Sequence, residues 1–119
     1  MRNVAAVAVV VSAVISGLVA YAQGPPPAAG IAVRPLFDNP AVGVARLLLL
    51  PGAREVTHTH PYDFVVVPVV SGRMEVQLAG KTEAKDYAPG DAFFIARNTP
   101  HTVANVGKTP FALLGVTIK

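Results

Sequence analysis

The chain has 119 residues, of which ten are Lys or Arg and seven are Asp or Glu, so its formal net charge is +3 at pH 7. These charges are scattered, with no cluster of basic and aromatic residues, which argues against nucleic-acid binding. Cysteine is absent, which excludes thiol catalysis and sulfur-ligated zinc. The length suits one small domain with a modest core.

Residues 1–22 have the pattern of a secretory signal peptide. A basic residue near the start precedes an apolar run from Val4 to Val19, and the order Ala20-Tyr21-Ala22 suits cleavage after its last residue. The alternative is an uncleaved membrane anchor, because about 18 apolar residues can span a bilayer. The sequence therefore predicts export to a periplasmic or secreted location, with membrane contact only during export.

Residues 23–34 are rich in Pro and Gly and predict an extended tether, because "GPPPAAG" can form neither a helix nor a strand ladder. Residues 35–119 predict one all-β domain. Eight short apolar or alternating runs, from "VGVARLLLL" to "FALLGVTIK" and including "EVTHTH", are divided by Gly, Pro, Asn and Asp. This spacing is typical of an antiparallel β-sandwich or barrel. Pro68 cannot donate to a ladder, so it predicts a bulge or an edge.

Two of the three histidines, His58 and His60, stand one residue apart in "THTHPYDF". Alternate side chains of a strand point to the same face, so these two imidazoles are placed to hold one metal ion together. A nearby carboxylate is a common partner for such a pair, but the positions where we would look for it hold Phe64 and Val65. The pair alone leaves open what completes the site.

The spacing Gly52-x5-His58-x-His60 resembles the first motif of the cupin superfamily, and "PGDAFFIARNTPHTVANVG" resembles the second. The resemblance to small single-domain, RmlC-like cupins covers about residues 42–118. It implies a cupin-like double-stranded β-helix, or jelly-roll barrel, that holds a divalent metal such as Fe, Zn, Mn, Ni or Cu. Three histidines and one glutamate usually hold that metal. His58, His60 and His101 match the histidines, and the glutamate of the first motif is missing.

Three imidazoles would leave metal positions open for water or substrate. Loss of the carboxylate raises the charge of the site by one, so we expect it to favour small anionic ligands. The alternative is that all three histidines are buried and satisfied in a barrel that has lost its metal. Phe64, Phe93 and Phe94 either line or fill the cavity. In the second motif Asn98 replaces a glycine, and we expect it to keep the loop geometry because Asn tolerates a left-handed turn.

Four more residues are candidates for the surroundings of the site. Asp63 is a ligand if the chain bends, a hydrogen-bond partner of a ligand histidine, or a solvated loop carboxylate. Tyr62 either contacts a ligand or packs at the barrel rim. Arg46 either reaches an acidic ligand or extends from an edge strand into solvent. Asn105 either faces the cavity or makes a structural hydrogen bond near a strand end.

Two functions of different class fit these residues. One is an enzyme with dioxygenase-like chemistry on a small organic acid, and the other is a non-catalytic module that binds a small molecule or a metal. Proton carriers near the histidine pair are limited to Asp63, Tyr62 and Glu55, which favours oxygen chemistry over hydrolysis or isomerisation. The apolar run Leu47–Leu50 suggests a face covered by a second subunit, so a homodimer is predicted.

Overall fold

A computed structural model describes residues 28–119, and these residues form eight β-strands and no helix. The strands are β1 (Ile31–Asp38), β2 (Val42–Leu49), β3 (Asp63–Pro68), β4 (Gly72–Leu78), β5 (Lys81–Tyr87), β6 (Phe93–Ile95), β7 (His101–Asn105) and β8 (Phe111–Ile118). The predicted all-β class is confirmed. The predicted signal peptide, residues 1–22, lies outside the described residues. Within the described part, no helix has the length and apolar character needed to cross a bilayer.

The first strand differs from the sequence-based expectation. The boundary predicted between tether and barrel, after residue 34, falls inside β1, and no run in this region was expected to be a strand. β1 pairs with β2, but the register shifts between Pro35 and Phe37. Such a bulge interrupts the period-two alternation by which a strand is recognised in a sequence.

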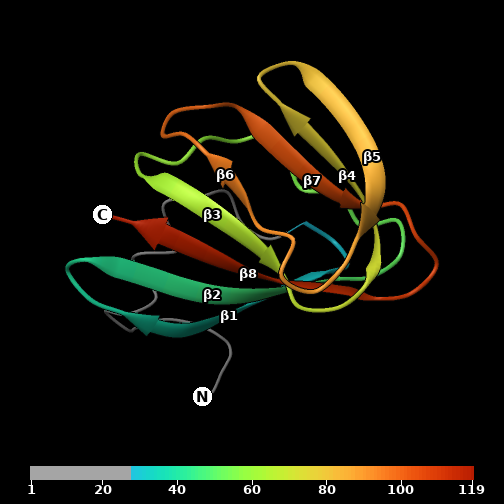
Figure 1. Ribbon diagram of the computed structural model, residues 1–119, viewed down its shortest axis with the longest axis horizontal. Coiled ribbons are helices and arrows are strands. Elements are labelled where there is room, and N and C mark those ends of the chain that lie inside the picture. The colour runs from blue at the N-terminus through green and yellow to red at the C-terminus, as the bar shows by residue number, and fades with distance from the viewer. Residues whose placement is uncertain (1–27) are drawn as a thin grey trace.

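The strands form two antiparallel sheets. One has the order β1-β2-β8-β3-β6 and the other has the order β5-β4-β7. In Figure 1 they lie as two layers, with β1, β2, β8 and β3 on one side and β7, β4 and β5 on the other. Side chains from both sheets fill the space between the layers. Among the largest fully buried ones are Phe111, Leu49, Met74, Ile95 and Val66.

The apolar run at the end of β2 places side chains on both faces of its sheet. Leu49 is fully buried opposite Phe111 of β8, whereas its neighbour Leu48 is 38% exposed opposite Ala112. Successive side chains of a strand point to opposite faces, so a continuous apolar run places half of its members outside the core. The outer face of the five-stranded sheet is therefore apolar as well.

Of the two alternatives predicted for Pro68, a bulge or an edge, the structure shows an edge. Pro68 is the last residue of β3 and pairs with Leu113 of β8 on one side. On the other side β6 pairs with β3 only as far as Val66. The missing N–H of Pro68 therefore leaves no gap in a ladder, as expected for proline at an edge.

The segment from Gly52 to His58 extends the smaller sheet beyond β7. The amide of Gly52 donates to the carbonyl of Asn105, and Asn105 donates back to Ala53, both at 2.9 Å. Further along, His58 and His101 exchange both backbone hydrogen bonds, at 3.1 and 3.0 Å. Between these points the pairing is incomplete, so "EVTHTH" contributes bridges to β7 and no regular strand. This pairing places the first histidine beside the last one.

Candidate metal centre

The three histidines converge at one place in the fold. His58 and His60 come from the segment that precedes β3, and His101 is the first residue of β7. One ring nitrogen from each lies within 4.8 Å of the corresponding nitrogens of the other two. The ring centroids are 4.3 Å apart for His58 and His101, and 4.8 Å apart for His58 and His60. Three imidazoles at these separations could coordinate one metal ion together.

Backbone carbonyls orient two of the rings. The Nδ1 of His58 lies 2.6 Å from the carbonyl oxygen of Val56, and the Nδ1 of His101 lies 2.9 Å from that of Thr99. A carbonyl can only accept, so in both rings Nδ1 carries the proton and donates it. In the neutral rings Nε2 then keeps its lone pair, which is the form that binds a metal.

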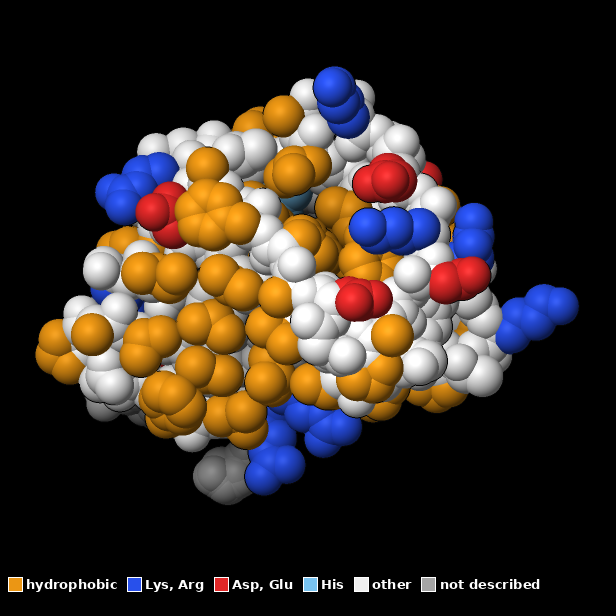
Figure 2. Space-filling model, in the orientation of Figure 1, with side chains coloured by type: hydrophobic (Ala, Val, Ile, Leu, Met, Phe, Trp, Pro, Cys, Tyr) orange, Lys and Arg blue, Asp and Glu red, His pale blue; other side chains and the backbone are white. Residues whose placement is uncertain are grey.

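Burial and the nearby imidazoles lower the pKa of two of the three rings, His60 and His101. His101 is only 2% exposed, and the other two rings are half-buried. Burial, followed by the charges that His58 and His101 would carry, lowers the pKa of His60 to about 4. Burial also lowers the pKa of His101, although its hydrogen bond to Thr99 acts in the opposite direction. Figure 2 shows a histidine at the floor of a hollow on the face in view, so solvent reaches the group.

Phe64 occupies the place at which the family motif has its glutamate. Its ring stacks on that of His60, with centroids 4.6 Å apart and an angle of 16° between the planes. Gly115 of β8 makes room for it, because a Cβ on Gly115 would lie 2.5 Å from Cζ of Phe64. Val65 is the next residue of β3 and therefore points to the opposite face of the sheet. Of the two candidate positions, Phe64 faces the histidines.

Asp63 lies with Arg97 and outside the three-histidine group. Its carboxylate accepts the backbone N–H of Arg97 at 3.0 Å and contacts the guanidinium at 3.4 Å. These hydrogen bonds, the side-chain one first, lower the pKa of Asp63. The amide of Asn98 also donates to the carbonyl of His60 at 2.7 Å. Asp63 thus ties the loop of the first two histidines to the loop before β7, a role absent from the sequence-based alternatives.

Asn98 has the left-handed conformation predicted for it, with φ of 61°. Asparagine is one of the few residues that adopt this conformation at low cost. The loop before His101 therefore keeps its turn without the glycine of the family motif.

The other predicted neighbours of the site are placed as follows. Asn105 is buried, donating from Nδ2 to the carbonyls of Leu49 and Thr109 and accepting the N–H of Gly107 at Oδ1. Asn105 therefore makes structural hydrogen bonds near the strand end, which is the second of the two roles considered for it.

Arg46 is exposed on β2, adjacent in sequence to the buried Ala45 and opposite Leu114 of β8. Arg46 extends to solvent from the outer face of the five-stranded sheet. Tyr62 is half-buried in the bend before β3.

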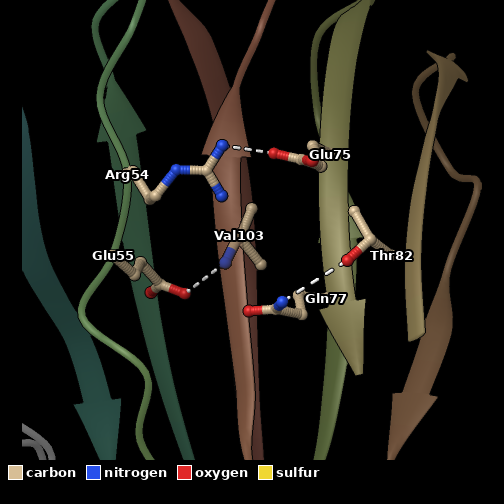
Figure 3. A network of polar contacts seen from close by, with 6 residues as sticks. All are labelled: Arg54, Glu55, Glu75, Gln77, Thr82 and Val103. Atoms are coloured by element: carbon tan, nitrogen blue, oxygen red, sulfur yellow. Dashed lines mark hydrogen bonds and ion pairs between the residues drawn. The ribbon is translucent and has the colours of Figure 1, made fainter. Parts of the chain in front are cut away.

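Glu55 is a residue whose role the sequence patterns did not indicate. Its carboxylate accepts the backbone N–H of Val103 at 3.0 Å, as Figure 3 shows. Burial raises the pKa of Glu55, and His58 and the Val103 amide oppose that rise. The available signal was a single carboxylate three residues before His58, which suggested only a proton carrier.

Two facing antiparallel sheets with three converging histidines define a small β-fold with a candidate metal centre. The chain belongs to the cupin family, because residues 45–117 match the family model described as the cupin domain. The resemblance inferred from the two motifs is confirmed.

This chain covers very different shares of two curated relatives. The germin-like protein subfamily 2 member 2 of Arabidopsis thaliana is 34% identical over 83 residues, which cover 67% of this chain and 38% of that protein. The β-alanine degradation protein BauB of Pseudomonas aeruginosa is 28% identical over 82 residues, covering 69% of this chain and 86% of that protein. The chain thus spans well under half of the germin-like protein and most of the bacterial one.

Solved structures agree on the fold. A cupin domain of Bordetella pertussis superposes with a TM-score of 0.68 at 25% identity, covering 80% of this chain and 97% of that domain. An oxalate oxidase in complex with the substrate analogue glycolate superposes with a TM-score of 0.64 at 24% identity, covering 76% of this chain and 51% of that one. The two sheets are therefore a cupin fold.

Proposed function

We propose that this chain binds one divalent metal ion through His58, His60 and His101. The observation that carries the proposal is the convergence of three ring nitrogens within 4.8 Å, in a family whose usual ligands match these positions. Neutral imidazole suits Fe, Zn, Ni and Cu, whereas Ca and Mg prefer oxygen ligands. The orientation of His58 and His101 by backbone carbonyls supports the proposal, because Nδ1 is engaged in both rings and Nε2 is the atom left for a metal.

The substrate class proposed for this site is a small organic acid. Phe64 stands where a carboxylate ligand would offset one charge of the metal, so the site retains more positive charge than a complete cupin site. Three protein ligands also leave positions open, and a carboxylate can occupy them. The oxalate oxidase neighbour binds glycolate, a small acid, which agrees with this class.

The reaction proposed is an oxygen-dependent, dioxygenase-like oxidation. Hydrolysis and isomerisation need a positioned proton carrier, but Asp63 is held by Arg97 and Glu55 by the Val103 amide. A redox-active ion such as iron would supply an oxygen-binding centre and a Lewis acid. The same shortage of proton carriers also favours the alternative of a binding module without turnover.

Two measurements on the metal-loaded protein test this function. Titration calorimetry should give tighter binding of oxalate and glycolate than of their neutral amides, and an oxygen electrode should report oxygen uptake with one of the acids. Preferential binding without oxygen uptake would favour the non-catalytic module. Equal binding of acids and amides would contradict the proposed substrate class.

We also propose that the chain is exported and forms a homodimer. Export rests on the pattern of residues 1–22, and amino-terminal sequencing of the protein recovered from the periplasm or medium should begin at Gln23. Recovery in the membrane fraction with an intact leader would support an anchor. The dimer rests on the apolar outer face of the five-stranded sheet.

A further inference from the structure

The segment before His58 contains a bulge opposite β7. Arg54 bridges to Ala104, and His58 bridges to His101. Three residues separate the two bridges on this segment, and only two separate them on β7. One residue is therefore extra, which is the definition of a β-bulge, and such bulges re-aim the side chains that follow them.

A side chain completes the ladder at this bulge. The amide of Glu55 donates to the carbonyl of Val103 at 3.0 Å, as in a regular antiparallel pair. The return bond, from the amide of Val103, goes to the carboxylate of Glu55. Figure 3 shows this side chain reaching across to β7, whereas the neighbouring Arg54 pairs with Glu75 on β4. Val103 is 4% exposed, so its amide would have no partner without this carboxylate.

The bulge also carries the acceptor that orients His58. The carbonyl of Val56, the residue after Glu55, accepts the Nδ1 proton of the His58 ring at 2.6 Å. Movement of the bulge would therefore move this carbonyl and turn the ring. A contiguous chain of contacts runs from the Val103 amide through Glu55 and Val56 to the histidine.

We propose that Glu55 is a positioning residue that fixes the bulge and so aims Nε2 of His58 at the other two imidazoles. The effect on metal binding rests on the proposed metal site. The positioning of the His58 ring rests only on the hydrogen bonds of Glu55 and Val56. The carboxylate acts as a hydrogen-bond acceptor of fixed reach, so length and acceptor matter and charge does not.

Three substitutions separate these properties. Glu55→Gln keeps the reach and an acceptor oxygen but removes the charge. Glu55→Asp keeps the charge but shortens the side chain, and Glu55→Ala removes both. Glu75→Ala is the matched control, because it removes a carboxylate from the same sheet that contacts Arg54 and none of the histidines.

Cobalt(II) titration followed by visible absorption gives the first readout. Glu55→Gln and Glu75→Ala should bind within about threefold of the unaltered chain, and Glu55→Asp and Glu55→Ala should lose about 10- to 100-fold in affinity. Normal binding by the Asp variant with loss in the Gln variant would overturn the proposal in favour of a charge effect. Equal affinity in all variants would overturn it altogether.

Nuclear magnetic resonance of the metal-free protein gives a second readout that does not depend on metal. The Val103 amide should exchange faster, and the His58 ring should lose its single Nδ1–H tautomer, in the Asp and Ala variants and not in the Gln variant. Absence of cobalt binding by the unaltered chain would refute the proposed function, while this second readout would still decide the role of Glu55. If Glu55→Ala does not fold, the comparison of Glu55→Gln with Glu55→Asp still decides the role of Glu55.

Discussion

At the scale of single residues, Phe64 sets this site apart from a complete cupin site. Its ring stacks on His60, so a carboxylate at the same position would lie next to the histidines. We predict that Phe64→Glu adds a fourth ligand and tightens metal binding by at least about tenfold, or about 1.4 kcal/mol. The dissociation constant is measured by competition with a chelator of known affinity.

Val65→Glu is the matched control for this change. Val65 lies on the opposite face of β3, so a glutamate there should leave the dissociation constant unchanged. Equal constants for Phe64→Glu and the unaltered chain would show that a carboxylate at position 64 does not complete the site.

The lowered pKa of His60 predicts a pH dependence of stability in the metal-free chain. The pKa is about 4 in the folded chain and about 6.5 in the unfolded one, so between these values the unfolded chain binds more protons. The contribution of His60 is complete above about pH 6.5, falls as the pH is lowered and is lost below about 4. We expect about 1 to 2 kcal/mol, because solvent reaches part of the ring.

Urea unfolding at pH 7.0, 5.5 and 4.5 measures this loss. His60→Gln should lose less stability than the unaltered chain over the same range, because it lacks the titrating ring. Parallel losses in both proteins would assign the pH dependence to other groups, such as the carboxylates.

At the scale of elements, Gly115 couples β8 to the site. A methyl group on Gly115 would lie 2.5 Å from Cζ of Phe64, closer than carbon atoms can approach. We predict that Gly115→Ala displaces the Phe64 ring and costs about 1 to 3 kcal/mol in the free energy of unfolding. Chemical denaturation measures the cost.

The double variant Gly115→Ala, Phe64→Leu distinguishes this cause from a general weakening of β8. A smaller side chain at 64 should relieve the clash, so the two changes should cost less together than the sum of their separate costs. Simple additivity would contradict the coupling.

Particular elements show what the sequence could predict. The histidine spacing and the second motif indicate the family and the three candidate ligands, because each motif is a short continuous stretch of the sequence. The sequence does not predict β1, because the bulge near Pro35 breaks the alternation of side chains. The sequence predicts a strand at "EVTHTH", where the structure has an incomplete ladder, because neither the bulge nor the Glu55 bond to Val103 has a sequence signature. The Asp63 contact with Arg97 joins residues 34 positions apart, and only the fold brings them together.

At the scale of the whole molecule, the outer face of the larger sheet is the place where a second copy would bind. Figure 2 shows apolar side chains gathered over β2, β8 and β3. Leu48 and Ile118 on this sheet are 38% and 42% exposed, and Phe94 of β6 is 54% exposed. A gathering of exposed apolar side chains of this kind is typical of an interface between subunits.

We predict that light scattering at micromolar concentration gives twice the chain mass, and that Leu48→Lys shifts the mass toward the monomer. Val56→Lys is the control, because Val56 is 58% exposed but lies on the segment beside β7. A monomer mass for the unaltered chain would contradict the homodimer.

The metal content of the purified chain is the most direct test of a metal site formed by His58, His60 and His101. The protein is prepared without an affinity tag and analysed by mass spectrometry of the elements, beside the double variant His58→Ala, His60→Ala. We expect about one equivalent of a single transition metal in the unaltered chain and none in the variant. The three-histidine site would be contradicted by an unaltered chain that contains no metal and takes none up from iron, manganese, zinc, nickel or copper, or by equal metal content in the variant.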